Sequence, residues 1–481
     1  METHANRETG FTRRAFFGAA VAGAAGVAAA PRLAAGAQAH VGGAAAGGRF
    51  KEPALDLPLR DDADVVVCGA GPAGVAAAIA AARAGARTRL FDVNGCLGGV
   101  WTAGLLCWMI DFKSTGLSAE ITRRLDERDA RRAQPSPSRY AYEPEEMKVL
   151  LESLCSEAGV KVRLHTGVRA AYREGSRLAT IVTESKSGRE AWRAKAFIDA
   201  TGDGDLGAFA GCGFDLGQPG TQRCQPLTLY ALALVKDAQA LKAYLTDEKA
   251  AGDTTQRYRS KTATLMRELQ RAGTPPSYGA PSIFYIRDNQ VLFMFNHEYG
   301  VNAHDADAIT AATLRARKEL TGMADGLRKL GGVWENVRIV ATSEHIGVRE
   351  GRRLHGRYQV TMDDLATGAR HGDAVVRTRF GVDIHSLSAD KSDSHGVLTK
   401  DLKVKAYDIP LRALIAKDVD GLMMAGRCIS GDFYAHASYR VTGNAVPMGE
   451  AAGKVAALAA QTGRLPHEVA WREVCAAPPS D

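Results

Sequence analysis

Three glycines and one carboxylate carry the clearest chemical signal in this sequence. Gly69, Gly71 and Gly74 have the Gly-x-Gly-x-x-Gly spacing of a dinucleotide-binding loop, and Asp92 follows a little over twenty residues later. In such a loop the first glycine allows a tight turn, the second lets the main chain approach a pyrophosphate, and the third lets a helix pack closely on a strand. Asp92 is placed to accept hydrogen bonds from an adenosine ribose. We therefore expect this segment to bind a dinucleotide.

The residues around this motif predict the βαβ unit that would position it. An aliphatic run at 64–68 predicts a buried strand, an alanine-rich stretch predicts a helix that stops at Gly85, and 87–91 predicts a second strand. The first turn of the helix, with Pro72 and Ala73, would point its N–H groups at the pyrophosphate. A βα turn without a ligand is the alternative, but strand, helix and acid all have the register that binding requires.

The N-terminal residues predict a targeting signal rather than a part of the fold. Arg13 and Arg14 lie in a twin-arginine signature at 12–17, an uncharged Ala/Gly stretch follows, and 37–39 offers a small-x-small cleavage site. This pattern predicts a signal peptide at 1–39, with the Tat translocase as a partner during export and a periplasmic or secreted mature protein. An Ala/Gly-rich tail with a chance arginine pair is the alternative.

Composition and charge argue against several other classes of protein. The 481 residues include 61 Lys and Arg against 54 Asp and Glu, a mild net charge of +7, so we expect no nucleic-acid partner. No apolar run after the signal has the length of a stable membrane span. The eight cysteines include no Cys-x-x-Cys pair, and the histidines lack ligand spacing, so we expect no iron–sulfur cluster and no metal site.

The remaining patterns predict an α/β protein: a Rossmann-like domain with a parallel sheet and a β-meander, plus an inserted α+β substrate or cap domain. We expect a linker at 40–61, a dinucleotide-binding domain at 62–224 and 403–465, a cap at 225–402 and a C-terminal tail at 466–481. The elements expected are helices at 143–158, 306–330, 349–359 and 446–460, strands at 161–165, 338–343 and 421–427, and a meander at 177–184 and 190–200.

Four separated segments together resemble one family. They are 65–74, the glycine-dense loop 95–104, the turn 200–203, and a C-terminal block at 424–430 and 449–453. The chain resembles the two-dinucleotide-fold FAD-dependent oxidoreductases over 63–465, with distant similarity to fumarate reductase flavoproteins and the flavin subunit of heterodisulfide reductase. It lacks the cluster cysteines of the latter, so iron is not carried over. The resemblance implies FAD as the cofactor.

The resemblance also implies which residues hold FAD. Gly98, Gly99 and Thr102 would line the diphosphate and ribityl side, and the main chain at Val168 would bracket the adenine. The C-terminal helix would point its positive end at the N1/O2 edge of the flavin. The other residues expected near the cofactor are Thr201, Gly202 and Asp203 on the phosphate side, Gly426 and Arg427 at the ribityl chain, and Asn444 and Pro447 at the helix start.

Four residues are candidates for the reaction itself. The family places the segment with His436 and Arg440 over the isoalloxazine, where the histidine could act as acid or base and the arginine could clamp an anionic oxygen. Arg349, on a predicted helical face with Arg353, could bind a substrate anion. His385 could pair with Asp383 as base and orienter. The alternatives are loop carbonyls satisfied by His436 and Arg440, and a salt-bridged structural helix at Arg349.

These expectations combine into an exported FAD-dependent dehydrogenase or reductase. It would act on a small organic substrate by hydride transfer to or from flavin N5, with an electron acceptor that the sequence does not identify. Two alternatives stay open: a flavin-dependent monooxygenase or halogenase, and a non-catalytic FAD protein that relays electrons.

Overall fold

The computed structural model describes residues 50, 52–132, 138–246, 255–391 and 403–475, without side chains for 255–259 and 391. Contacts divide the chain into Met1–Asp56 and Leu57–Asp481, and every element discussed below belongs to the second unit. The predicted signal peptide, half of the predicted linker and the last six residues of the predicted tail lie outside the described residues.

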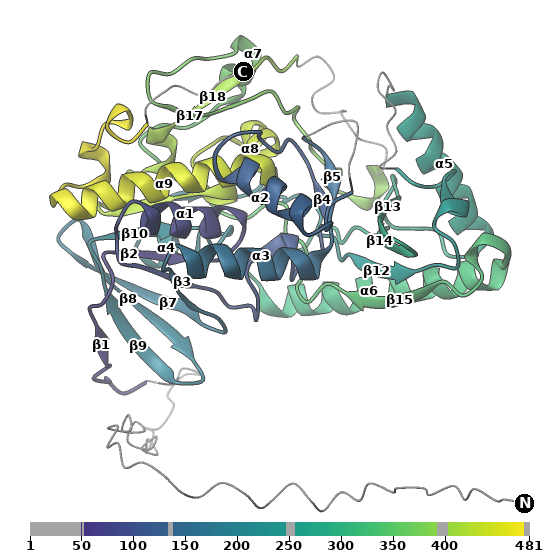
Figure 1. Ribbon diagram of the computed structural model, residues 1–481, viewed down its shortest axis with the longest axis horizontal. Coiled ribbons are helices and arrows are strands. Elements are labelled where there is room, and N and C mark those ends of the chain that lie inside the picture. The colour runs from purple at the N-terminus through teal and green to yellow at the C-terminus, as the bar shows by residue number, and fades with distance from the viewer. Residues whose placement is uncertain (1–49, 51, 133–137, 247–254, 392–402, 476–481) are drawn as a thin grey trace, which may run out of the picture. The chain divides into compact units, whose positions relative to one another are not determined.

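A five-stranded parallel sheet forms the centre of this unit (Figure 1). Its strand order is that of the Rossmann fold, in which the first strand lies beside the fourth and the order reverses between them. All four neighbouring pairs are parallel. The predicted α/β fold class is therefore confirmed. In spatial order the strands are β19 (Leu422–Met424), β10 (Ala196–Asp199), β2 (Val65–Cys68), β3 (Thr88–Phe91) and β6 (Lys161–Arg163).

Two helices from opposite ends of the sequence lie against each other beside this sheet (Figure 1). They are α1 (Pro72–Arg83) and α9 (Thr442–Thr462). A Cβ atom added to Gly449 would lie 2.1 Å from the carbonyl oxygen of Ala73, and one added to Gly453 would lie 2.2 Å from that of Ala77. The two backbones thus approach more closely than any side chain would allow. Nearby are α2 (Gly116–Glu127) and α3 (Pro144–Glu157).

A meander of three antiparallel strands packs on the sheet at β3. They are β7 (Gly167–Glu174), β8 (Arg177–Ser185) and β9 (Gly188–Arg193), and the short β1 (Leu59–Arg60) pairs parallel with β9. The Trp192 ring of β9 contacts the Phe91 ring of β3 at 4.9 Å between centroids. Both rings are buried, so the meander and the sheet share one core.

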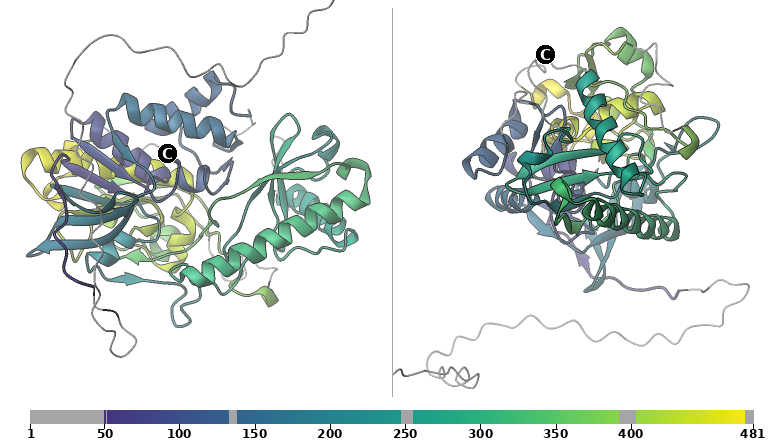
Figure 2. Two further views of the ribbon diagram at one scale, coloured as in Figure 1. Left: turned by 90° about the horizontal axis from the view of Figure 1, so that it is seen from below. Right: turned by 90° about the vertical axis from the view of Figure 1, so that its right-hand side faces the viewer.

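A second sheet, here called the cap sheet, comes from the middle of the sequence (Figure 2). Residues of opposite faces join different cores, as the two-residue period of a strand requires. Tyr230 and Leu232 pack with the main core, whereas Ala231 and Ala233 pack toward the long helix α6. The cap sheet comprises β13 (Ser282–Arg287), β14 (Gln290–Met294), β12 (Ala231–Leu234) and β15 (Arg338–Thr342), with α5 (Thr255–Arg271) and α6 (Ala306–Leu330) on one face.

The other short elements lie outside these two sheets, and six of their strands form three two-stranded sheets. Within the described residues, no helix has both the length and the apolar character needed to cross a membrane. The remaining elements are β4 (Trp108–Met109), β5 (Tyr140–Ala141), α4 (Asp205–Phe209), β11 (Phe214–Asp215), β16 (Arg353–Leu354), α7 (Met362–Thr367), β17 (Ala374–Thr378), β18 (Tyr407–Pro410) and α8 (Phe433–Tyr439).

The predicted helix at 349–359 is wrong, so Arg349 and Arg353 do not share a helical face. This segment is irregular up to β16, which pairs antiparallel with β11. A Cβ on Gly351 would lie 2.3 Å from a carboxylate oxygen of Asp203, so the chain here is pressed against a distant turn. These tertiary contacts outweigh the local pattern of charged residues.

Three further boundaries differ from the prediction. The arm expected at 190–200 is two strands, β9 and β10, which belong to different sheets. The last helix begins at Thr442 rather than near 446, so Pro447 lies inside it, one turn beyond the start. Between the Gly426 turn and that helix, where a loop was expected, the chain forms α8. The predictions for β2, β15 and α6 agree with the structure to within a residue or two.

Candidate active site

The glycine motif forms a cradle at the point where the strand order of the central sheet reverses, between β2 and β10. Gly69 has φ +93°, and a Cβ there would lie 2.4 Å from the carbonyl oxygen of Ala200. A Cβ on Gly74 would lie 1.8 Å from the Gly69 oxygen, so this residue must be glycine for helix and strand to pack. In contrast, a Cβ on Gly71 would meet nothing within 4 Å. The open side of the cradle therefore lies at the second glycine, where a pyrophosphate would approach.

The other glycine-rich segments reach the same place. A Cβ on Gly99 would lie 2.9 Å from the Cα of Gly71, and one on Gly426 would lie 3.1 Å from the Ala73 side chain. The N–H of Gly98 donates to the Ala70 carbonyl at 2.8 Å. The loop after β3 and the turn after β19 therefore both border the first turn of α1.

The turn after β10 completes this arrangement. Arg427 donates to the Asp203 carboxylate at 2.7 Å, and a Cβ on Gly202 would lie 2.8 Å from the same guanidinium. Thr201 is held by Asp199, which accepts from both its N–H and its hydroxyl. The segments that the resemblance assigned to the phosphate and ribityl sides thus lie together. Their contacts with the cofactor stay a prediction.

Asp92 lies at the end of β3 with 6% of its surface exposed. Its carboxylate accepts from the Ala70 N–H at 2.5 Å and from the main chain and side chain of Asn94, each at 2.8 Å. Burial raises the pKa of this carboxyl above its ordinary value. Asp92 therefore fixes the glycine loop itself, and the predicted ribose contact would be an additional role.

Thr102 and Val168 have less distinctive surroundings. The Thr102 hydroxyl is buried and donates to the Leu97 carbonyl at 2.5 Å, which closes the loop at 95–104. Val168 is buried in β7, and its carbonyl accepts from the Arg169 side chain at 2.9 Å. The structure shows a local structural role for Thr102, and the predicted cofactor contacts of both residues stay untested.

The first turn of α9 is the second polar surface suited to a cofactor. Its N-cap residue is Val441, whose apolar side chain cannot accept a hydrogen bond. The N–H groups of this turn are therefore not capped by the N-cap side chain. Asn444 in this turn is 0% exposed, and neither atom of its amide has a hydrogen-bond partner in the described part of the chain. A buried amide without partners carries a large desolvation penalty, so it indicates a missing polar group. The edge of a flavin ring fits this place.

The segment immediately before α9 carries His436 and Arg440. His436 is fully buried in α8, and burial, followed by the charge of Arg353, lowers its pKa well below the ordinary range. A histidine in this environment is neutral and is a poor proton donor. Arg440 donates to the main-chain oxygen of Asp383 at 2.8 Å and lies 3.4 Å from the Asp383 carboxylate.

Asp383 also contacts His385, with 3.4 Å between Oδ2 and Nε2. The two residues lie in an irregular segment, and they contact each other. Burial, and then the charge of Arg349, lowers the pKa of His385 to about 3. We call Arg349, Asp383, His385 and Arg440 the arginine–histidine cluster. It brings together three of the four predicted catalytic residues, and His436 lies one turn before Arg440 on α8.

Arg349 enters this cluster from the segment after the cap sheet. One of its terminal nitrogens donates to the Pro226 carbonyl and to the Thr228 hydroxyl, each at 2.7 Å. The neighbouring Glu350 is bound elsewhere, since it accepts from Arg353 at 2.5 Å and from the Gln225 N–H at 3.1 Å. The salt-bridged helix considered as the alternative for Arg349 is therefore absent.

The cap contributes aromatic and imidazole rings that sequence reasoning missed. The His297 ring lies 3.9 Å from that of Tyr278 and 5.0 Å from that of His385. Nδ1 of His297 lies 3.2 Å from the Tyr299 hydroxyl, which itself donates to the Ser277 carbonyl at 3.3 Å. Because that hydroxyl proton is already used, Nδ1 of His297 must be the donor in this pair. No local spacing links these residues, so no motif could have revealed them.

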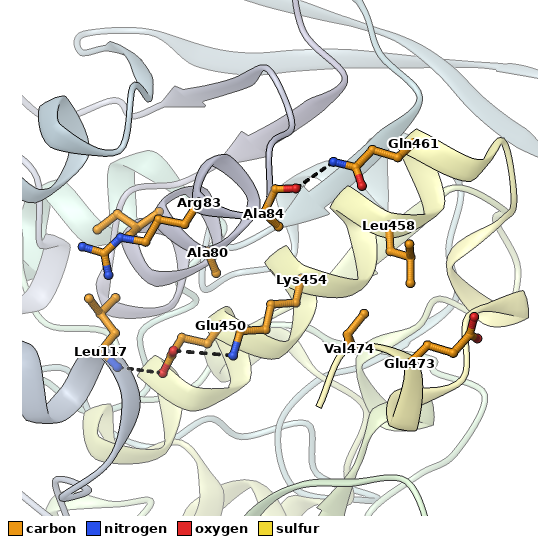
Figure 3. Close-up of a pocket in the computed structure, with 11 residues that line it drawn as sticks. Ala80, Arg83, Ala84, Leu117, Glu450, Lys454, Leu458, Gln461, Glu473 and Val474 are labelled. Carbon is orange, nitrogen blue, oxygen red and sulfur yellow. Dashed lines mark hydrogen bonds and ion pairs between the residues drawn. The ribbon is translucent and has the colours of Figure 1, made fainter. Parts of the chain in front are cut away.

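A pocket in the described part of the chain lies away from these residues. It has a volume of about 370 Å³ and lies at the far end of α1 from the cradle, between that helix, α9 and the C-terminal residues (Figure 3). Glu450 on its wall accepts from the Leu117 N–H at 3.1 Å and faces Lys454. This pocket includes none of the predicted site residues.

Cysteine and metal chemistry find no support in the described residues. Seven of the cysteines are free thiols there, namely Cys68, Cys96, Cys107, Cys155, Cys212, Cys224 and Cys428, and burial raises the pKa of Cys428 well above its ordinary value. No group of three or more His, Cys, Asp or Glu side chains in the described ranges has a geometry that could hold a metal ion.

Comparison with known proteins identifies the family. The family described as FAD dependent oxidoreductase matches residues 64–477, and the chain belongs to it. The protein is accordingly an FAD-dependent oxidoreductase enzyme with FAD as its cofactor. The open cradle at Gly71 and the orphaned amide of Asn444 are consistent with such a cofactor.

Individual relatives are more remote. Thiamine thiazole synthase of Aeropyrum pernix is 33% identical over 120 residues, which are 25% of this chain and 43% of that protein. The enzyme of the same name from Pyrococcus abyssi is 31% identical over 108 residues, 22% of this chain and 41% of that protein. The chain thus matches about two fifths of the length of these curated relatives.

Solved structures of similar fold have low sequence identity. A geranylgeranyl bacteriochlorophyll reductase-like protein of Thermoplasma acidophilum has a TM-score of 0.42 and 14% identity, with 84% of this chain and 80% of that chain covered. The p-nitrophenol 4-monooxygenase PnpA of Pseudomonas putida DLL-E4 has a TM-score of 0.45 and 10% identity, with 84% and 81% covered. Likenesses at this level support no further inference.

Proposed function

We propose that this enzyme is a dehydrogenase or reductase whose reaction takes place between the first turn of α9 and the arginine–histidine cluster. The observation that carries the proposal is the position of Arg440. It lies four residues before the orphaned Asn444 amide and is bound to Asp383, which in turn contacts His385. A surface suited to the flavin edge and a set of polar side chains from the cap segment are thus adjacent.

FAD, when bound, supplies the acceptance or donation of a hydride at N5. The side chains of the protein bind and position the substrate. In this proposal, Arg440 holds an anionic oxygen of the substrate, and Asp383 keeps the guanidinium in place. His385, neutral because of its burial, positions the substrate by hydrogen bonding rather than by charge. His436 is fully buried, and its burial keeps the imidazole neutral, so in this proposal it is not the acid or base.

An anaerobic reduction experiment tests this function. The FAD-loaded protein is mixed, without oxygen, with a panel of small hydroxy acids, amino acids and unsaturated acids, and flavin bleaching or reoxidation is followed at its visible absorption band. Rapid bleaching by one compound, with the oxidised product recovered in equal amount, supports a dehydrogenase. Bleaching that occurs only with partner proteins would support the electron relay, and an oxygenated product would support a monooxygenase.

Arg440→Lys sharpens the experiment, because an ammonium keeps the charge but not the planar two-donor fork. We expect the variant to retain FAD and to lose most of its rate of bleaching. Arg317→Lys serves as the matched control, since Arg317 lies on α6 and bonds the Thr342 hydroxyl at 3.0 Å, away from the cluster. Equal rates in both variants would contradict the role of Arg440.

We also propose that the protein is exported by the twin-arginine route and works in the periplasm or outside the cell. The support is the sequence signature with Arg13 and Arg14. Replacement of both by lysine keeps the charge but removes the signature, so FAD-loaded precursor should accumulate in the cytoplasm. Normal periplasmic amounts of the double variant would refute export by this route.

A further inference from the structure

Arg349 is a buried cation without a carboxylate partner in the described part of the chain. It is 8% exposed, and both of its hydrogen-bond acceptors, the Pro226 carbonyl and the Thr228 hydroxyl, are neutral. A buried charge is expensive unless it is paired, so an arginine in this state indicates an anion that completes the site.

Three other arginines in or near the cluster do have a carboxylate partner. Arg353 is bound to Glu350 at 2.5 Å, Arg427 to Asp203 at 2.7 Å, and Arg440 lies 3.4 Å from Asp383. Each of these three cations therefore has its own carboxylate. Arg349 differs from them, which leaves one positive charge in excess within the cluster.

The orientation of Arg349 is fixed, and part of its guanidinium remains for a ligand. Both acceptors bind the same terminal nitrogen, so the other terminal nitrogen and Nε keep three of the five donors. These two nitrogens form the side of the fork that binds a carboxylate with two parallel hydrogen bonds. The charge of Arg349 acts on His385, Arg440, Tyr230 and Tyr299, so it lies among the groups of the site.

We propose that Arg349 binds a carboxylate of the substrate, so that the substrate is a small organic acid. The proposal rests on the proposed function, because it places the substrate at the arginine–histidine cluster. It adds the chemical class of the substrate and a residue that selects it. Arg440 and Arg349 would then contact the same molecule, Arg440 near the flavin and Arg349 on the side of the cap.

A binding experiment tests the proposal without turnover. The FAD-loaded protein is titrated at pH 7 with benzoate and its neutral isostere benzamide, and with succinate and succinamide, and the shift of the flavin absorption spectrum reports binding. In the natural protein the acid of at least one pair should bind about 10- to 100-fold more tightly than its amide. This range is that of a charged hydrogen bond, roughly 1.5–3 kcal/mol.

Two substitutions assign the discrimination to Arg349. Arg349→Met should remove the preference for the acid and leave the FAD content unchanged, and Arg349→Lys should keep only part of the preference. Arg317→Met, the control on α6, should keep all of it. Melting temperatures of the three variants show whether each one is folded. If Arg349→Met is unfolded, the reduced preference of Arg349→Lys for the acid tests the proposal instead.

Each of the other outcomes overturns the proposal. A preference that survives in Arg349→Met would show that another group binds the acid. Loss of FAD from Arg349→Met would show that the arginine serves the cofactor. Anaerobic bleaching of the natural protein by neutral compounds alone would agree with the proposed function but would refute an organic acid as the substrate. Bleaching by no compound would refute the proposed function itself.

Discussion

Asp92 has a structural role in the glycine loop, and we expect it to bind the cofactor as well. Its carboxylate holds the Ala70 N–H in the glycine loop, and a ribose contact would come in addition. We predict that Asp92→Ala weakens FAD binding by about 10- to 100-fold, the equivalent of one or more charged hydrogen bonds. Fluorescence titration of the apoprotein with FAD measures this.

Asp92→Asn is the matched variant for this prediction. Its amide oxygen can still accept from the main chain, so it should lose less affinity than the alanine variant. Unchanged FAD affinity in Asp92→Ala would remove Asp92 from the cofactor site.

His385 predicts a dependence of stability on pH. Its pKa is lowered to about 3 in the folded protein, whereas the unfolded chain binds a proton below about pH 6.5. The contribution of His385 is therefore complete above pH 6.5 and is lost as the pH falls toward 3. Between pH 7 and pH 5 this amounts to about 2 kcal/mol.

Thermal melts at pH 7 and pH 5 test this prediction. His385→Gln should lose less stability on acidification than the natural protein, whatever its stability at pH 7. His355→Gln, a substitution at a more exposed histidine, is the control and should lose as much stability on acidification as the natural protein. Equal pH dependence in all three proteins would contradict the buried neutral state of His385.

At the scale of elements, the contact between α1 and α9 aligns the two helix ends that we expect to face FAD. The Gly449 backbone lies directly on that of Ala73, which itself belongs to the first turn of α1. We predict that Gly449→Ala forces the helices apart and destabilises the fold by roughly 1–3 kcal/mol. The displacement should also reach Asn444, which lies about one turn earlier on α9, and should change the flavin absorption spectrum.

Lys454→Ala on the same helix is the control for this prediction. Lys454 is partly exposed, and its contact with Glu450 is long, at 4.0 Å. It should change neither the melting temperature by more than a few degrees nor the spectrum. A Gly449→Ala protein with the stability and spectrum of the natural one would show that the two helices can accommodate a methyl group at this contact.

The elements also show which features a sequence reveals. The βαβ unit was predictable because its strand, glycines, helix and acid are adjacent, and the long helix α6 because its pattern repeats over many turns. The segment at 349–359 was not, because contacts with Asp203 and Gly431 determine its path. The arginine–histidine cluster joins residues from 349 to 440, and its neighbours Tyr278 and His297 come from yet another part of the chain. Only the fold brings them together.

At the scale of the whole molecule, the central sheet needs both ends of the folded unit. β19 pairs with β10, and α9 covers α1. We predict that a chain ending at residue 420 fails to retain FAD, although it contains the complete glycine motif and Asp92. A chain of residues 57–481 should retain it. Absorbance of bound flavin after gel filtration compares the two, and retention by the shorter chain would show that the N-terminal half suffices.

The pairing of β19 with β10 has a further consequence for the order of events during synthesis. The glycine loop leaves the ribosome early, but the strand β19 and the helix α9 are translated several hundred residues later. Contacts so distant along the chain form slowly, since a long loop must close before they are made. On this argument FAD can be captured firmly only after α9 has been translated, and the alanine-rich surface of α1 remains uncovered until then. Firm binding of the cofactor would thus be a late step in the maturation of this protein.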